Sequence, residues 1–494
     1  MDTTADDPTR LPPSQGEARV ALDGATLDVD TLVRIADADT HPEPAPEALE
    51  RAHRSWRTAG RLAAAGGLYG RGTGVGAHRS IAVDPGDEAE HGLRLLRSHA
   101  GGAGELLPAR QARALLAVRA NQLLAGGSGI HPAFVTALTD ALRLGVHPAI
   151  SEFGGVGTGD LTALAQTGLT LIGERPWCCE PVRELPAPVT LGPGDALALL
   201  SSNALALGQA ALAAHALGTL LRATHAVAAL SLAAVSGSLE AYAAPVHALR
   251  PYPGAAHAAA EIRRLLADAA PAARRIQDPF GFRAFPQVHG CALDASRALR
   301  RIIEVEINCP SENPLLDAEA GTAHHHGGFF AAPLGLALDG LNLAVLQTAQ
   351  LSTARLAALG RPDLTALPAF LAAGPASSSG TMILEYTANS ALAELRWSAA
   401  PASAGHAVLS HGLEEAASFA GQAARQALRA ADAYATVLAC ELVSAVRALR
   451  LRPGAPRPPA LAAAAAVLPV GTDDRPLTAD VAAASELLPV LAGL

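Results

Sequence analysis

The stretch ISEFGGVGTGDLTALA, residues 150–165, predicts more about the fold than any other part of the chain. Four glycines within six residues allow backbone angles that other residues avoid. Asp160 follows the last of these glycines and is placed to cap a helix that begins at Leu161. The simplest interpretation is a tight turn that leads into a helix. A phosphate-binding loop is the alternative, but the stretch lacks the following Lys-Ser/Thr and the dinucleotide spacing of such loops.

The composition favours a mostly α-helical protein. Hydrophobic residues make up 50% of the 494-residue chain but aromatic residues only 3%, so a core must consist mainly of Ala, Leu and Val. Ala and Leu are strong helix formers, and the length suits two or three ordinary domains or one large helical assembly. The net charge of −9 gives no electrostatic reason to expect nucleic acid or an anionic membrane as partner.

The cysteines and the apolar segments indicate where the protein works. The five cysteines show no zinc-ligand spacing, which favours a reducing cytoplasm. Residues 1–18 are acidic and lack an apolar core, which predicts a disordered lead rather than a signal peptide. Residues 196–221 carry no charged side chain and are long enough to span a bilayer. Polar residues interrupt this segment and alanine dominates it, so we predict a helix buried in a large bundle and no membrane partner.

The periodicity of apolar residues divides the chain into elements. A strand, a glycine turn and a short helix are predicted over 20–36, a helix over 46–62, and a broken helical segment over 90–125. Long helices are predicted at about 195–240, 255–276, 287–303, 333–359, 380–398, 411–448 and 477–488. The predicted domains are an N-terminal domain over 19–195, a central helical bundle over 196–450 and a C-terminal segment over 451–494 that packs on the bundle.

Several motifs resemble one enzyme family. The stretch 150–165 resembles the segment of the histidine and phenylalanine ammonia-lyases that reads Gly-Ser-Val-Gly-Ala-Ser-Gly-Asp-Leu, with Asp160-Leu161 as its last two residues. The loop YGRGTGVG, residues 69–76, is similar to the family's Tyr-Gly-x-Asn-Thr-Gly-Phe-Gly, and residues 277–290 are similar to its Gln-Asp-x-Tyr-Ser-x-Arg run. Further matches follow in the family's order at 98–101, 126–129, 306–308, 312–314, 401–403, 414–415 and 474–477.

The resemblance covers nearly the whole chain and implies the family's fold. This is a mainly α subunit of the ammonia-lyase/fumarase-like superfamily, with a long antiparallel helical bundle and a smaller N-terminal domain that bears glycine loops. The resemblance also implies a homotetramer whose active sites are each built from several subunits.

The chemistry of the family explains its site residues. An Ala-Ser-Gly triad cyclises and dehydrates into a methylidene-imidazolone (MIO), an electrophile that captures the substrate amine, while a tyrosinate removes the β-proton. The resemblance implies that Tyr69 is this base and that Arg283 anchors the substrate carboxylate through a bidentate pair. Gln277 is then a supporting polar contact. His99 and Glu414 match the positions at which histidine lyases hold the polar ring of the substrate.

The triad itself departs from the family. Gly157, Thr158 and Gly159 stand where Ala-Ser-Gly is expected. Thr158 can in principle dehydrate, but the product would carry an extra methyl group on the carbon that must accept the amine. That carbon would be more crowded and less reactive. The sequence therefore argues against a normal self-derived MIO, and it predicts no external cofactor and no metal.

Three further departures fall near the triad. Ser201 replaces the family's asparagine that contacts the electrophile, unless Asn203 takes this role from a shifted register. Phe280 replaces the second tyrosine and cannot donate a hydrogen bond. The segment 327–333, which contains the predicted substrate contact Phe329, has lost the polar groups of the family's Gly-Asn-Phe-His-Gly-Glu-Pro.

These observations support three hypotheses. The first is an ammonia-lyase or aminomutase acting on histidine, tyrosine or a related amino acid, with a modified MIO or none. The second is an MIO-independent elimination, isomerisation or cyclisation of a specialised metabolite, with Tyr69 as base. The third is a non-catalytic homologue. The retained base, anchor and ring-binding pair favour a pocket for a carboxylate-bearing or amino-acid-like small molecule.

Overall fold

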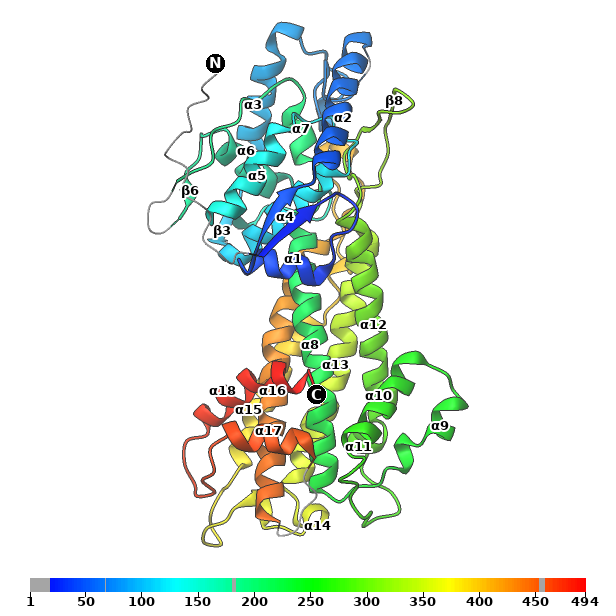
Figure 1. The fold of residues 1–494 in the computed structure, drawn as a ribbon, viewed down its shortest axis with the longest axis vertical. Helices are drawn as coiled ribbons and strands as arrows, with labels where there is room; N and C mark the ends of the chain where they lie inside the picture. Colours follow the sequence, from blue (N-terminus) through cyan, green and yellow to red (C-terminus); the bar gives the residue numbers. More distant parts are fainter. Residues whose placement is uncertain (1–17, 67, 180–183, 453–457) are drawn as a thin grey trace, which may run out of the picture. The chain divides into compact units, whose positions relative to one another are not determined.

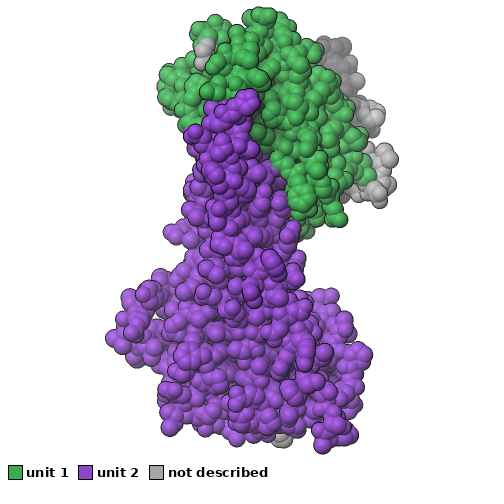
Figure 2. All heavy atoms as spheres, turned by 180° about the vertical axis from the view of Figure 1, so that it is seen from behind, with its two compact units in different colours: residues 1–154, 161–202, 307–326 green, residues 155–160, 203–306, 327–494 purple. Residues whose placement is uncertain are grey.

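The computed structural model describes residues 18–66, 68–179, 184–452 and 458–494. Within this part of the chain it contains two compact units, coloured separately in Figure 2. Unit 1 comprises Met1–Gly154, Leu161–Ser202 and Ile307–His326, and unit 2 comprises Gly155–Asp160, Asn203–Glu306 and Gly327–Leu494. The predicted lead over 1–18 lies outside the described residues except for Ala18, which begins a strand.

Unit 1 is built around helix α4 (Ala109–Leu124), which is buried on almost every side. Helices α1 (Val29–Ala36) and α5 (Ala133–Leu144) pack against it, and strands β1 (Ala18–Leu22) and β2 (Thr40–Pro44) pair in parallel (Figure 1). The strand, turn and helix predicted over 20–36 are therefore confirmed. The remaining elements of the unit are α2 (Pro46–Ala65), α3 (Glu88–His99), β3 (Ala103–Leu106), β4 (His147–Pro148), β5 (Ser151–Phe153), α6 (Leu161–Leu171), β6 (Trp177–Cys178), α7 (Asp195–Leu200), β7 (Leu315–Asp317), β8 (Thr322–His324) and the 3₁₀ turns Gly76–His78 and Pro85–Asp87.

Unit 2 is a bundle of long helices. Helix α16 (Ala420–Leu451) packs against α8 (Ala204–Ala234), α13 (Ala332–Leu359) and α15 (Met382–Ser398), and α12 (Phe285–Glu306) packs against α13 and α10 (Pro253–Leu265), as Figure 1 shows. The predicted mainly α fold with a helical bundle is confirmed. The shorter elements are α9 (Ala244–Ala248), α11 (Phe280–Arg283), α14 (Pro362–Thr365), α17 (Pro459–Val467), α18 (Thr478–Leu491) and the 3₁₀ turns Glu240–Tyr242, Ala369–Leu371, Ala402–Ala404 and Ser410–Gly412.

Helix α8 accounts for most of the apolar segment of the sequence. By length and composition the stretch Asp195–Ala234 could cross a membrane, but 78% of its most apolar window is buried inside the protein. The prediction of a buried bundle helix is confirmed. A helix that is apolar all round suits burial in a bundle. Its alanines allow neighbouring helices to approach closely from several sides.

Three predicted helix limits are wrong. The helix predicted over 195–240 is interrupted at 201–203, where Ser201 has a non-helical ψ of 70°. The helix predicted over 255–276 ends at Leu265, six residues before Pro271. The helix predicted from 411 begins only at Ala420, because Phe419 before it adopts a left-handed conformation with φ of 50°.

Candidate active site

The glycine-rich loop that opened the sequence analysis forms a tight turn at residues 155–160 of unit 2. Gly157 and Gly159 have φ values of +86° and +112°, a region in which a side chain is strained but glycine is not. Both glycines are buried, and Thr158 between them is half-buried. The loop therefore presents one hydroxyl-bearing side chain on an unusually contorted backbone.

The loop is held by the chain segment that leads into α16. Three consecutive loop carbonyls, at residues 155–157, each accept one hydrogen bond from residues 418–422; we call this arrangement the carbonyl clamp. Its pairs are Ser418 Oγ to the Gly157 oxygen, Phe419 N to the Val156 oxygen and Gln422 Nε2 to the Gly155 oxygen, each 2.9 Å. Hydrogen bonds to three successive carbonyls restrain the conformation of this irregular, partly buried segment.

Asp160 ends the loop and joins it to a different helix from the one predicted. Its buried Oδ2 accepts a hydrogen bond from the Ala206 N–H, 2.9 Å away, in the first turn of α8. The prediction that Asp160 caps the helix beginning at Leu161 is wrong, because the carboxylate instead pairs with N–H groups in the first turn of α8, which have no partner within that helix. Burial raises the pKa of Asp160 to about 6, against the lowering effect of the N–H donors.

Asn203 lies at the N-terminus of the same helix. Its Nδ2 donates to the backbone oxygen of Phe329. Its Oδ1 is buried and has no hydrogen-bond partner among the described residues. Since buried polar atoms are almost always paired, this oxygen is available to a group that joins the site. Two predicted site residues, Asn203 and Phe329, are thus in contact with each other.

The predicted carboxylate anchor lies elsewhere in unit 2. Arg283 is the last residue of α11, and its Nε donates to the Asp278 backbone oxygen at 2.9 Å. Its guanidinium carbon lies 4.2 Å from the centre of the Phe280 ring, an arrangement that attracts a cation to a ring face. Phe280 is 64% exposed, and Gln277 is also exposed. The three predicted residues form one half-exposed group.

Contacts with the two ends of helix α13 give the distance between this group and the loop. Its residue Arg355 donates to the Gly281 oxygen at 3.1 Å. Its residue Gly335 lies against the clamp, since a Cβ there would be 2.9 Å from the Ser418 oxygen. Twenty residues of continuous helix separate Gly335 from Arg355, which is about 30 Å. Arg283 and Thr158 of one protomer therefore lie at opposite ends of α13.

The predicted base belongs to unit 1. The phenolic oxygen of Tyr69 accepts a hydrogen bond from the Gly76 N–H at 2.7 Å, and its ring meets that of His325 edge-on with centroids 6.4 Å apart. Tyr69 and Ser201 line one small cavity together with Glu312. The Glu312 carboxylate is buried and pairs with Arg119 Nη1 at 2.8 Å, while the Ser201 hydroxyl donates to its own helix at the Leu197 oxygen.

The predicted ring-binding pair is divided between the two units. His99 of unit 1 is the last residue of α3, and its Nδ1 lies 2.9 Å from the Leu95 oxygen and 3.0 Å from Ser98 Oγ. Glu414 of unit 2 is half-buried and forms a backbone bridge with Leu409, four residues before the clamp residue Ser418.

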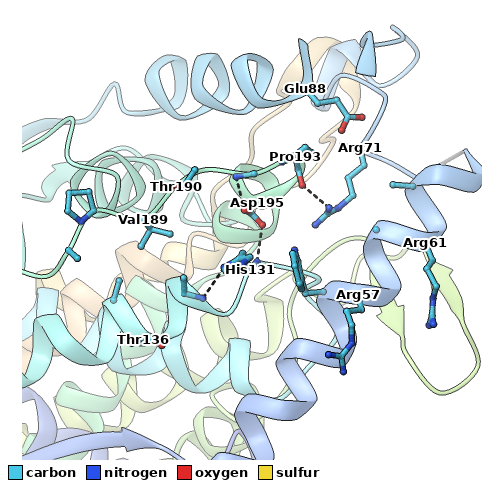
Figure 3. Close-up of a pocket in the computed structure, with 18 of the residues that line it drawn as sticks. Arg57, Arg61, Arg71, Glu88, His131, Thr136, Val189, Thr190, Pro193 and Asp195 are labelled. Atoms are coloured by element: carbon cyan, nitrogen blue, oxygen red, sulfur yellow. Dashed lines mark hydrogen bonds between the residues drawn. The ribbon is translucent and has the colours of Figure 1, made fainter. Parts of the chain in front are cut away.

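Unit 1 also contains a large cavity of about 1310 Å³, shown in Figure 3, which no predicted site residue lines. Arg71 reaches across it and donates to the backbone oxygens of Pro193, at 2.7 Å, and Gly129, at 2.6 Å. Burial lowers the pKa of Arg71, and Asp195 nearby opposes that shift. Arg71 thereby ties the loop of Tyr69 to two other segments. Arg71 stands at a variable position of the family's Tyr-Gly-x-Asn motif, so no sequence pattern predicts this role.

Asp195 organises another wall of the cavity in Figure 3. Its carboxylate accepts the N–H groups of His131 and Gly192, each at 2.9 Å. The rings of His131 and Trp56 meet edge-on at 4.7 Å. The one available sequence signal was Trp56, a rare aromatic residue in the helix predicted over 46–62.

The electrophile of the resembling family is made from the protein itself, so the loop can be tested for its ability to form one. The positive φ angles of Gly157 and Gly159 permit the folded-back backbone that a five-membered ring needs. Thr158 supplies a hydroxyl to be lost as water, and the unpaired Oδ1 of Asn203 offers a polar contact near the loop. The residues fit a ring of this kind that carries one additional methyl group.

Comparisons with known proteins bear on the family and the fold. Residues 27–468 match the model of a family described as aromatic amino acid lyase. The chain is 34% identical over 491 residues to a histidine ammonia-lyase of Myxococcus xanthus, covering 95% of this chain and 96% of that protein. It resembles the structure of a tyrosine aminomutase from Streptomyces globisporus (TM-score 0.89, 26% identity, 96% and 97% coverage). It also resembles ergothionase, an ergothioneine-degrading enzyme from Treponema denticola (TM-score 0.88, 25% identity, 96% and 99% coverage).

Proposed function

Because this chain belongs to the aromatic amino acid lyase family, we propose that it eliminates ammonia from an amino acid of the histidine or tyrosine type, or moves the amine within one. Both the histidine ammonia-lyase that this chain resembles over nearly its full length and the aminomutase of similar structure act on a carbon–nitrogen bond. The observation that carries the proposal is the retention of the tyrosine base and the arginine anchor in a chain whose triad has changed.

Tyr69 is proposed as the base that removes the β-proton. The β-proton of an amino acid is weakly acidic, so its removal needs a positioned proton acceptor. The Gly76 N–H holds the phenolic oxygen on the loop, and Arg71 fixes the loop from its other side. The base is thus on a rigid support although it lies in a glycine-rich segment.

Arg283 is proposed as the carboxylate anchor. With Nε committed to the Asp278 oxygen, Nη1 and Nη2 remain to form a bidentate pair with a carboxylate. Arg283 lies about 30 Å from the loop of its own protomer along α13. We therefore propose that it serves the loop of a neighbouring protomer, which requires the homotetramer that the family resemblance implied.

The surface of the bundle supports such an assembly. Helix α15 exposes Ile383, Tyr386 and Trp397 at 56%, 68% and 78%, and their spacing places them on one face of the helix. Large apolar side chains that follow one helix face commonly mark protein–protein contacts. Phe280 and Gln277 beside Arg283 are exposed as well, as residues that complete a site in another subunit must be.

The loop 157–159 is proposed to supply a Thr158-derived, methyl-bearing version of the family's electrophile. When formed, this group captures the substrate amine and makes it a better leaving group. Asn203 would orient it through Oδ1, and Phe329 and Glu414 would contact the substrate. Phe280 in place of a tyrosine leaves one hydrogen bond to the group unmade, which suits a slower or more specialised reaction than that of ordinary relatives.

The proposal is tested by two measurements on the purified full-length protein. Incubation with histidine, tyrosine, phenylalanine and related amino acids should release ammonia with an α,β-unsaturated acid, or yield a β-amino acid. Intact-protein mass spectrometry should show a mass below that of the sequence by two water molecules. The absence of any product over a broad panel would exclude the activity, and an unmodified mass would exclude the electrophile.

A second candidate is an elimination, isomerisation or cyclisation of a specialised metabolite that uses Tyr69 without the electrophile. The departures at Thr158, Phe280 and 327–333 favour it, because all of them affect the electrophile and none affects the base. An unmodified protein mass together with Tyr69-dependent turnover of such a compound would establish this second function.

We propose a cytoplasmic location. In the described part of the chain no disulfide joins the five cysteines, Cys178, Cys179, Cys291, Cys309 and Cys440, as expected in a reducing compartment.

A further inference from the structure

We propose that Ser418 is the positioning residue for ring closure in the 157–159 loop, an inference that rests on the proposed function. Its hydroxyl holds and polarises the one carbonyl that must be attacked for the loop to cyclise. Ser418 lies in none of the family motifs, and 261 residues separate it from the carbonyl that it contacts.

The covalent chemistry identifies this carbonyl. A five-membered ring made from three successive residues must contain the Gly157 carbonyl carbon, three Thr158 atoms (N, Cα and the carbonyl carbon) and the Gly159 nitrogen. The Gly159 nitrogen forms a bond to the Gly157 carbon, and the Gly157 oxygen leaves as water with the N–H protons of Gly159 and Thr158. A carbon–nitrogen double bond to Thr158 N remains. Thr158 then loses its Oγ1–H and its α-hydrogen as a second water.

The hydroxyl of Ser418 is aimed at the oxygen that departs. Its Oγ lies 2.9 Å from the Gly157 oxygen and accepts the Ala420 N–H at 3.4 Å, so its own proton is directed to the carbonyl. The side chain is 4% exposed, and a hydrogen bond in such a water-poor site stabilises developing charge on oxygen effectively. Phe419 N and Gln422 Nε2 hold the two preceding carbonyls.

The close approach of Ser418 also accounts for the glycine at position 157. A Cβ on Gly157 would lie 2.1 Å from Ser418 Oγ and 2.8 Å from the Phe419 nitrogen. An alanine, as in the family's triad, therefore cannot occupy this position unless both the hydroxyl and the backbone at Phe419 move. The φ of +86° adds strain for any side chain there. Gly157 and Ser418 act as one pair.

The experiment follows the loss of two waters by intact-protein mass spectrometry during expression and incubation. Ser418→Ala should slow this loss about 100-fold, the usual effect of removing one such donor. The matched control is Ser444→Ala, which removes an equally buried hydroxyl from the distal part of α16 and should mature like the wild type. Gly157→Ala should block maturation, because its Cβ would meet both Ser418 Oγ and the Phe419 backbone nitrogen. Thermal unfolding of each variant reports on folding.

The outcomes separate this inference from the proposed function. If the wild type and Ser418→Ala both mature fully and fold, the role of Ser418 is overturned while the electrophile stands. If the wild type keeps its sequence mass, both the electrophile and the role of Ser418 are overturned. If Ser418→Ala does not fold, Ser418→Cys supplies the same test, because a thiol has nearly the same size but is a weak donor; normal maturation of Ser418→Cys would then contradict the proposal.

Discussion

The guanidinium carbon of Arg283 lies 4.2 Å from the centre of the Phe280 ring, so the proposed carboxylate anchor is stacked on the residue that replaces the family's second tyrosine. The ring cannot donate a hydrogen bond, but it restrains a side chain that would otherwise sample many rotamers. The family resemblance implies a tyrosine at position 280; a phenylalanine there keeps a ring on which the Arg283 guanidinium stacks but lacks the hydroxyl.

Truncation at this pair should affect substrate binding more than turnover. Phe280→Ala should raise KM about 2- to 5-fold, because a half-exposed cation–ring contact contributes about 0.5–1 kcal/mol. Arg283→Lys should lower kcat/KM about 10- to 100-fold through loss of the bidentate pair. Steady-state kinetics measures both. Arg297→Lys, an exposed arginine paired with Asp294, is the control, and an equal effect there would contradict the role of Arg283.

Tyr69→Phe should abolish turnover and leave substrate binding nearly unchanged. Removal of a general base costs about 10²- to 10⁴-fold in kcat, while the ring and its packing remain. Turnover assays and calorimetric titration with substrate distinguish the two effects. Tyr252→Phe changes an exposed tyrosine and should behave like the wild type. Undiminished turnover of Tyr69→Phe would remove Tyr69 from the mechanism.

Arg71→Met should loosen the loop that carries Tyr69. The change leaves the Pro193 and Gly129 oxygens without their donor. Pro193 is exposed, so water can replace the donor there, but Gly129 is buried, and an unsatisfied buried group costs about 1–3 kcal/mol. Denaturant unfolding should show a loss of stability of that order, with a reduced kcat. Arg57→Met is the control, since its ion pair with Glu50 is exposed on both sides and contributes at most about 1 kcal/mol.

Asp160 should give the protein a stability that falls as the pH rises from about 4 to about 6. Burial raises its pKa from 3.8 to about 6, so the folded state binds the proton more tightly than the unfolded state in this range. The contribution is fully present below the unfolded pKa and is lost as the pH passes the folded value. Asp160→Asn should flatten this part of a curve of unfolding free energy against pH. An identical slope in wild type and variant would refute the assignment.

His225 should give the protein a stability that falls as the pH falls, the opposite of the dependence expected from Asp160. It lies in the bundle beside His257 and His289, with ring centroids 5.6 and 4.8 Å away, and burial lowers its pKa from 6.5 to about 4. Its contribution is present above the unfolded pKa and is lost as the pH falls from 6.5 to 4. His225→Gln should reduce acid destabilisation in this range, by up to about 3 kcal/mol. The exposed His406→Gln should not, and unfolding monitored by circular dichroism compares the two.

The helical architecture was predictable because helix formation in Ala- and Leu-rich segments depends mainly on the local sequence. The buried α8 followed from a segment without charges, and α2 followed from its proline start and apolar spacing. The helix ends were harder to predict: Phe419 takes a left-handed conformation that its residue type does not suggest, and it delays the start of α16 to Ala420.

The contacts of the candidate site depended on long-range packing. No local pattern indicates that Asp160 caps α8 rather than α6, or that Ser418 reaches Gly157, because both choices are made by helices from distant parts of the chain. The family motifs indicated Asn203 as a candidate. They did not indicate that its Nδ2 bonds to the Phe329 backbone oxygen and leaves Oδ1 unpaired among the described residues.

The carbonyl clamp can form only late in the synthesis of the chain. Residues 155–157 are synthesised more than 250 residues before the residues that donate hydrogen bonds to their carbonyls. Until those residues emerge from the ribosome, the glycine-rich turn lacks the clamp. Any self-processing of Thr158 that depends on the clamp is consequently a late event, and a truncated chain that stops before α16 would remain chemically immature.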